Sequence, residues 1–418
     1  MKIRQLSIFE FDKFALNHPL SSYHQTSSYA LFQSEQGKDY DLIGLVDDNN
    51  EIIAASLIIL KKINLFFSYG YAPKGFLMNY FDERIVKEFT SKLKKYYFKR
   101  NVAFIKINPE IEIGQIDLKK KTITYNRNKH IISTLKKYDF KKKETNKLFE
   151  TKLPAHNAIV LLKNYSFNKL SKNTRNKIHK GENSGIYIEK GTRDDIRKLY
   201  ELFKLQKDRP VSYYLNYYNA FSKKDEIDIF LLKIDFEKCL INLREKYEKE
   251  LEINNKLSDK VLKNASPENL KRKMVSDKNL NSYNQNIGIA TQYLAAHKEL
   301  CIGGAITIKH KNRINILISS YDKKFKQYSP NYFLHYALLE HYKKDYDFID
   351  LNGITGNFSE NNPYKGLNDF KSGFNPLSFE YIGEYDFIIN SGLYKSMEEN
   401  GVLAKEFNKK QKNITFEK

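Results

Sequence analysis

Residues 41–63, DLIGLVDDNNEIIAASLIILKKI, contain two apolar runs separated by the polar turn Asp-Asp-Asn-Asn. Apolar runs joined by such a turn predict a β-hairpin. Residues 82–100 predict a helix, because their apolar side chains fall on one helical face: Ile85, Val86, Phe89, Leu93 and Tyr96. Residues 101–110 predict another strand, which Pro109 ends. The order strand, strand, helix, strand defines an α/β unit.

The same order of elements returns in the second half of the chain. Residues 301–322 predict two strands, residues 331–348 a helix, and residues 349–356 a strand that runs into a loop. Two related α/β halves are the simplest account of this recurrence. We therefore expect a first domain over 1–155, with residues 384–418 packed on it, and a second domain over 156–235 and 299–383.

The segment between the two parts of the second domain, residues 236–298, predicts a helical arm. Its apolar residues recur at heptad positions: Leu240, Leu243, Tyr247, Leu257 and Val261. Pro267, with Ser266 as N-cap, suits the first turn of a returning helix. We expect an antiparallel pair of helices with a weak seam, because Glu250 and Asn254 occupy core positions, and hence a mobile arm.

The composition points to an anionic partner. The chain has 418 residues, a formal charge of +21 and a pI near 9.4. Compositional drift toward lysine and asparagine accounts for part of the charge, but it explains local clusters poorly. The two cysteines, Cys239 and Cys301, have no metal-ligand spacing, and no signal peptide or membrane-spanning run is apparent. We expect a cytoplasmic protein, peripheral to the membrane at most.

Two segments concentrate the positive charge. Residues 119–147 carry eleven Lys or Arg, interleaved with aromatic residues, and residues 169–181 predict a basic helix. Such segments suit phosphate backbones and unpaired bases, and equally anionic lipid headgroups or a solvated lysine-rich face. In KDRPVSYY (207–214), Arg209 precedes a rigid proline and phenolic side chains, an arrangement that suits phosphate binding but also an ordinary helix terminus.

Familiar catalytic motifs are missing from the sequence. QNIGIA (285–290) matches the pyrophosphate loop of acetyltransferases, but it lies in the returning arm with no strand before it, so we interpret it as a chance match. His335 and His341 form no triad or metal set. Catalysis is expected to depend on positioning and charge stabilisation.

Several blocks, taken in order over nearly the whole chain, resemble the FemABX family of aminoacyl-tRNA-dependent transferases that build peptidoglycan bridges. The blocks are YHQTSSYALFQ, IIAASLI, APKGFLMNY, IKINPE, SKNTRNKIHKG, DRPVSYY, the arm, DLNGITGNF, DFKSGFN and EYIGEYD. The resemblance implies an α/β protein with two GNAT-like domains and an antiparallel helical arm inserted in the second. It also implies transfer of an amino acid from charged tRNA to the stem peptide or bridge of a peptidoglycan precursor, without a metal or coenzyme.

The resemblance also implies roles for particular residues. Lys371 in DFKSGFN matches the channel lysine that would stabilise an oxyanion, with Phe370 shaping the wall. Glu384 matches an acidic position that could take up the amine's proton if burial raises its pKa. The implied substrate-binding residues are Arg209, Tyr213, Phe370, Lys74 and Asn108.

The chain departs from the family pattern at three positions. Asn108 replaces an acid before Pro109, Gln33 stands where a precursor-binding lysine can occur, and Ile318 where a site tyrosine can occur. These departures favour a lipid-linked acceptor over a nucleotide-linked one. They also leave open a different acceptor, and the sequence does not reveal which amino acid is transferred.

Two other functions are compatible with parts of the sequence. An acyl-CoA-dependent GNAT N-acyltransferase would need a pyrophosphate loop in the correct place, and none is found. A non-enzymatic RNA-binding module would use the basic helices and the arm, and replacing Lys371 would leave its binding intact.

Overall fold

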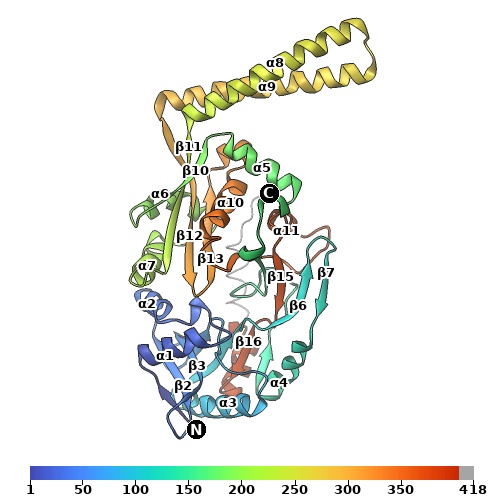
Figure 1. Cartoon of the computed structure of the whole chain (residues 1–418). Coiled ribbons are helices and arrows are strands. Elements are labelled where there is room, and N and C mark those ends of the chain that lie inside the picture. Colours follow the sequence, from blue (N-terminus) through green and yellow to red (C-terminus); the bar gives the residue numbers. More distant parts are fainter. Residues whose placement is uncertain (404–418) are drawn as a thin grey trace.

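The computed structural model describes residues 1–403. Two twisted sheets follow one another along the molecule, and a long helical hairpin projects from the second (Figure 1). The first sheet has the strand order β1 (Lys2–Gln5), β2 (Tyr40–Val46), β3 (Ile52–Lys62), β4 (Ser68–Ala72), β5 (Val102–Ile107), β16 (Tyr385–Ile388), β8 (Phe140–Lys142). The predicted hairpin is confirmed as β2 and β3, paired antiparallel with Leu42 opposite Leu57.

The second sheet is larger and mixed. Its order is β10 (Ile186–Lys190), β11 (Ile227–Asp235), β12 (Glu299–His310), β13 (Arg313–Tyr321), β14 (Phe348–Gly353), β9 (His156–Leu161), β15 (Leu377–Tyr381), β6 (Glu112–Asp117), β7 (Thr122–Tyr125). The expected first domain of 1–155 does not form one sheet. Its strands β6 and β7 join the second sheet through β15. β16 pairs with β5 in the first sheet. Part of the segment 384–418, residues 404–418, lies outside the described residues.

The helices surround both sheets (Figure 1). The first half carries α1 (Ile8–Asn17), α2 (Ser27–Glu35), α3 (Glu83–Phe98), α4 (Ile131–Lys137) and, near the C-terminus, α12 (Ser391–Glu399). The second half carries α5 (Lys172–Glu182), α6 (Asp195–Lys204), α7 (Val211–Ser222), α10 (Pro330–Tyr342) and α11 (Lys365–Ser372). The predicted helix after the hairpin is confirmed as α3, which buries Val86, Phe89 and Leu93.

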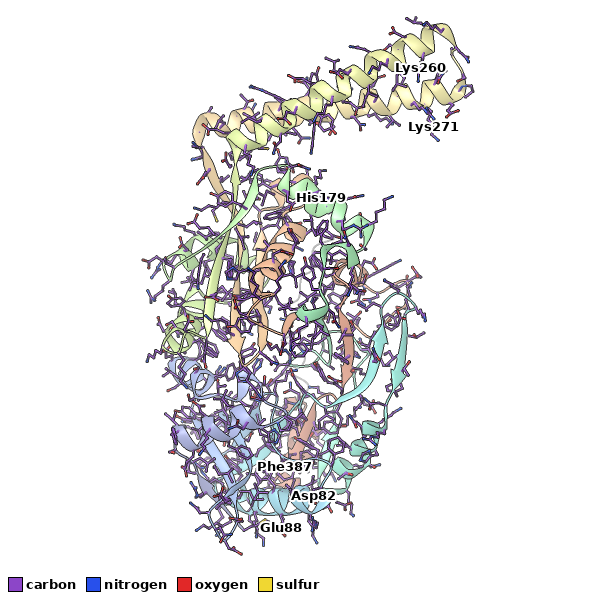
Figure 2. The ribbon with its side chains drawn as sticks, viewed as in Figure 1. Asp82, Glu88, His179, Lys260, Lys271 and Phe387 are labelled. Atoms are coloured by element: carbon purple, nitrogen blue, oxygen red, sulfur yellow. The ribbon has the colours of Figure 1, made fainter. Side chains whose placement is uncertain are left out.

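The predicted arm is confirmed as α8 (Phe236–Lys263) and α9 (Pro267–Ala296). Ser266 caps α9 by accepting from the Asn269 N–H, with Pro267 in the first turn. Lys260 and Lys271 lie toward the far end of this hairpin (Figure 2). The polar seam is satisfied internally, because Asn254 donates to Ser276 at 3.1 Å. QNIGIA lies within α9, so it forms no loop that could hold a pyrophosphate.

One apolar cluster crosses the junction of the two halves. It joins Leu57 and Ile59 of the first sheet to Ile306 and Ile318 of the second, through aromatic side chains of α2 and α7. The rings of Phe32 and Tyr217 lie 3.8 Å apart, centroid to centroid. This shared core fixes the two sheets relative to each other and so positions the side chains at their junction.

Candidate active site

Lys371 is buried in the last turn of α11. Its Nζ donates to the carbonyl oxygen of Gly353, at the end of β14, at 2.5 Å. Burial lowers the pKa of Lys371 to about 7, although the nearby Asp350 carboxylate opposes the shift. The amine therefore changes its charge near neutral pH, where an ordinary lysine remains charged.

Two glycines allow the close packing that buries this lysine. A Cβ added to Gly353 would lie 2.6 Å from the Pro154 ring. A Cβ added to Gly373, just after α11, would lie 2.1 Å from the hydroxyl of Thr174 in α5. The Gly373 carbonyl accepts from the Ser171 N–H at 3.0 Å. Any larger residue at Gly373 would separate α11 from α5 and move Lys371.

An aromatic wall stands beside Lys371. The ring of Phe370 lies 4.8 Å from that of Tyr332, 4.9 Å from that of His335 and 5.3 Å from that of Phe374, centroid to centroid. Burial lowers the pKa of His335 to about 4, so the imidazole is neutral. The surroundings of the Lys371 amine are therefore apolar on this side, which strengthens its electrostatic effect on a bound charge.

Behind this wall lies a basic cavity of about 450 Å³. Tyr332 lines it, together with Lys177, Lys180 and Lys326. The Nζ of Lys177 lies 4.4 Å from the centre of the Tyr332 ring and 3.2 Å from its hydroxyl. The basic helix expected over 169–181 is α5. Part of the predicted positive surface therefore contacts the aromatic wall beside Lys371, through Lys177 and Tyr332.

A buried ionic cluster joins the two halves near Lys371. Arg313 of β13 donates to Glu110 at 2.8 Å and also to Asp350 of β14. Lys74 pairs with Glu110 at 3.2 Å, and its backbone N–H donates to Asn108 at 2.8 Å. Burial alone would raise the pKa of Glu110, but the Arg313 and Lys74 charges outweigh it and lower that pKa to about 2. Lys74 and Asn108 are thus brought together.

Arg209 and Tyr213 form a second site at the junction. The Arg209 guanidinium is exposed and lies 5.0 Å from the centre of the Tyr213 ring. Tyr213 packs edge-on against Phe32 of α2, at 5.3 Å between centroids. The first half therefore supports the Tyr213 ring that the second half presents beside the exposed Arg209.

Lys38 supplies an amine beside Gln33, one of the residues that depart from the pattern expected in the sequence. The Lys38 Nζ donates to Gln33 Oε1 at 2.7 Å. Burial and the positive charges of Arg209 and Lys152 lower the pKa of Lys38. Its proximity to Arg209 has no signal in the sequence, because the two residues lie in different halves.

A line of cations extends from Arg209 along the first sheet. Lys152 lies over the rings of Tyr69 and Tyr71, 5.1 and 5.0 Å from their centres. Lys61 lies over the same two rings, at 5.6 and 5.7 Å. We call this line the basic track; it comprises Lys61, Lys152, Lys38 and Arg209.

Glu384 lies in the first half, just before β16, whereas Lys371 belongs to the second. The Glu384 carboxylate is buried, lies 3.1 Å from the Lys106 Nζ and accepts from the Lys152 backbone N–H at 2.9 Å. Lys106 also donates to Asp386 at 2.5 Å. Glu384 therefore fixes the backbone of Lys152, one of the residues of the basic track.

Other features of the described chain bear on ligands. Within residues 1–403, His, Cys, Asp and Glu form no group of three or more that could hold a metal ion. In the same range, no helix combines the length and the apolar character needed to cross a bilayer. Ile318 is buried in the apolar cluster at the junction.

The fold and the site together define a two-part α/β protein with an inserted helical arm and a buried lysine near the junction. The model of the FemAB family matches residues 6–399. The chain therefore belongs to the FemAB family, which confirms the resemblance seen in the sequence.

Curated relatives and a solved structure are similar over nearly the full length. Aminoacyltransferase FemA of Staphylococcus epidermidis is 24% identical over 415 residues, covering 94% of this chain and 97% of the relative. Lipid II:glycine glycyltransferase of Staphylococcus haemolyticus is 23% identical and covers 93% of each chain. The crystal structure of FemX, 18% identical, superposes with a TM-score of 0.73 over 95% of this chain and all of that one. The FemX structure confirms the fold.

Proposed function

We propose that this protein is an aminoacyltransferase that moves an amino acid from aminoacyl-tRNA to an amine of a peptidoglycan precursor. The buried Lys371 carries the proposal, because it lies between a basic cavity and an ionic cluster shared by both halves. Relatives named aminoacyltransferase FemA and lipid II:glycine glycyltransferase support it.

The reaction is an aminolysis of an ester. The acceptor nitrogen attacks the ester carbonyl carbon, a C–N bond forms, and the C–O bond to the tRNA ribose breaks. The nitrogen loses a proton and the leaving ribose oxygen gains one. A charged Lys371 stabilises the oxyanion between these steps, and its burial away from water strengthens the effect.

The basic track is suited to the phosphates of the acceptor. Arg209 offers a planar fork for phosphate oxygens, and Lys38 adds a second cation beside it. Tyr213 holds the guanidinium by a cation–π contact. We propose that the acceptor is lipid-linked and that the protein works at the inner face of the membrane.

The basic cavity is suited to the acceptor end of the tRNA. Its lysines can neutralise phosphates, while Tyr332 offers a ring on which a base can stack. Phe370 contacts Tyr332, so a 3′ end held there would place its aminoacyl ester near Lys371. The segment 119–147, on β7, α4 and β8, offers a further phosphate-binding surface.

The proposed functions of Lys74, Asn108 and Glu384 follow from their contacts. Lys74 pairs with Glu110 and is hydrogen-bonded to Asn108, so these residues form the part of the site that the first half contributes. The acceptor amine would enter there. Glu384 is enclosed and paired with Lys106, an arrangement that suits a positioning role better than the proton transfer expected from the sequence. It would act through Lys152 on acceptor binding.

The decisive experiment compares Lys371→Ala with Lys365→Ala. Lys365 lies on the same helix but is exposed and pairs with Glu360 at 2.8 Å. Each protein is incubated with charged tRNAs and lipid-linked precursor, and the product is weighed by mass spectrometry. We expect Lys371→Ala to lower transfer by about 10²- to 10³-fold with tRNA binding retained, and Lys365→Ala to resemble the parent.

Two results would assign another function. RNA binding without transfer to any precursor would favour the RNA-binding module. Transfer from acyl-CoA, independent of tRNA, would favour the GNAT N-acyltransferase.

A further inference from the structure

The turn between β3 and β4 presents two adjacent apolar side chains to solvent. Leu65 is 94% exposed and Phe66 is 75% exposed. Single exposed apolar residues are common on soluble proteins, but two neighbours at one tip form a patch that suits a partner.

This turn is preformed. The Asn64 side chain accepts from the backbone N–H groups of Phe66 and Phe67, at 2.9 and 2.8 Å. The Ile63 N–H donates to the Phe67 carbonyl at 2.8 Å, while the Ile63 side chain packs against the core beside Tyr69. The backbone is therefore fixed at the base of the turn, and a partner would bind it without ordering a loop.

Cations and a further aromatic ring lie beside the tip. The Ser68 N–H donates to the Asn101 carbonyl at 3.1 Å, which places the turn after α3 next to the base of the hairpin. The last residue of α3, Phe98, is 55% exposed, and Lys99, which begins the turn, is exposed as well. Lys62 is exposed at the end of β3. We call this surface the docking tip; it comprises Lys62, Leu65, Phe66, Phe98 and Lys99.

The docking tip lies at the end of the strand on which the basic track begins, with Lys61 and Lys62 on opposite faces of β3. Lys61 is opposite Tyr69 in the pairing of β3 with β4, one residue before Lys62. From there the track continues through Lys152 to Lys38 and Arg209. The apolar side chains of the docking tip therefore lie beyond one end of the basic track, and Arg209 lies at the other end.

We propose that the docking tip binds the surface of an anionic lipid bilayer. Leu65 and Phe66 enter the boundary of the acyl chains, while Lys62 and Lys99 contact the headgroups. A substrate anchored in that bilayer would enter the basic track from this end. This last step rests on the proposed function, whereas the binding of the bilayer does not.

The absence of tryptophan from the sequence allows a direct test. Phe66→Trp places a single reporter at the tip, and Leu262→Trp places one on the arm, where Leu262 is 85% exposed. Vesicles of phosphatidylglycerol and phosphatidylcholine in equal parts are added to each full-length protein. We expect a blue shift of emission and quenching by brominated lipid for Phe66→Trp, and neither for Leu262→Trp.

Flotation with the same vesicles measures the contribution of the tip. Replacing both Leu65 and Phe66 by Ser is expected to weaken binding by about tenfold or more, with an unchanged melting temperature because both side chains are exposed. Leu262→Ser should bind like the parent. Vesicles of phosphatidylcholine alone should bind the parent more weakly, because they remove the attraction to Lys62 and Lys99.

Three results would overturn the proposal. One is unchanged emission of Phe66→Trp with vesicles, and another is an equal loss of binding in Leu262→Ser. The third is a blue shift without lipid that grows with protein concentration, which would assign the tip to a second copy of the chain. Transfer to a detergent-solubilised precursor should persist in the double Ser variant, so loss of bilayer binding and loss of catalysis are separable.

Discussion

The Arg313 guanidinium of β13 donates to the Glu110 carboxylate, which follows β5, at 2.8 Å and so connects the second sheet to the first. The same guanidinium donates to Asp350 of β14. One buried cation is therefore shared by a carboxylate from each half. Because Asp350 also acts on the charge of Lys371, this contact couples the junction to the candidate catalytic amine.

Replacing Arg313 by Met should destabilise the protein severely. Two buried carboxylates would lose their shared cation, which typically costs about 3–5 kcal/mol. The matched control is Arg272→Met on the arm, because Arg272 pairs with Glu268 in solvent and such pairs contribute about 0–1 kcal/mol. Urea unfolding at pH 7 compares the two variants. Equal effects would show that the junction does not depend on Arg313.

The same ionic cluster predicts a pH dependence. The pKa of Glu110 is lowered in the folded protein to about 2 from 4.5, so Glu110 stabilises the fold above pH 4.5. This stability is lost as the pH falls toward 2. Glu110→Gln should therefore flatten the decline of melting temperature between pH 4.5 and 2, as measured by calorimetry. A decline identical to the parent's would contradict the assignment.

The buried Lys371 is predicted to lower the free energy of unfolding at neutral pH. Its pKa is about 7 in the folded protein and 10.5 in the unfolded chain, so the unfolded chain binds more protons between these values. Lys371→Met should raise the free energy of unfolding at pH 7 by about 1–3 kcal/mol while lowering transfer by about 10²- to 10³-fold, as Lys371→Ala should. The gain should shrink as the pH rises toward 10.5, which denaturation at pH 7 and pH 10 can measure. A less stable variant at pH 7 would contradict this.

The rate should follow the charge of the same amine. If the ammonium stabilises the oxyanion, kcat/KM should fall above pH 7, where Lys371 loses its proton. Any residual activity of Lys371→Arg should lack this fall, because a guanidinium stays charged. A parent rate that rises through pH 7 and then levels would identify Lys371 as a base instead.

Local sequence patterns were sufficient to predict several individual elements of the fold. The apolar runs of β2 and β3, the face of α3, and Pro267 with Ser266 in the arm each carry a local signal, and the structure confirms all of them. The place of β6 and β7 was not predictable in the same way. β6 pairs with β15, more than two hundred residues away, and β7 follows by pairing with β6; pairing over such a distance leaves no mark in the local sequence.

The site shows the same limit. The resemblance pointed to Lys371, Arg209 and Lys74 individually. The contacts that surround them depend on residues whose types are ordinary in their own segments: Glu110, Arg313, Asp350 and Lys38. Such charged residues become informative only when the fold buries them together, because burial makes an unpaired charge costly.

Arg209→Ala should weaken binding of the acceptor more than catalysis. Removing the fork beside Lys38 should raise KM for the precursor by about tenfold or more, with a small change in kcat. Lys38→Ala should act in the same direction but less strongly, since a single ammonium makes fewer directed contacts. Arg197→Ala, an exposed arginine on α6, serves as the control. Steady-state kinetics at two salt concentrations would detect the charge dependence, and a fall in kcat alone would disprove the assignment.

Glu384→Gln separates positioning from proton transfer. The amide keeps an acceptor for the Lys152 N–H but removes the charge that pairs with Lys106. A positioning role predicts a higher KM for the precursor, an almost unchanged kcat and an unaltered pH profile, because the basic track shifts while the chemistry continues. A fall of kcat by about 100-fold at constant KM would instead restore Glu384 as the proton acceptor. Asp386→Asn is the control for a general loss of folding. It removes the other carboxylate partner of Lys106, so it should lower the melting temperature as much as Glu384→Gln does.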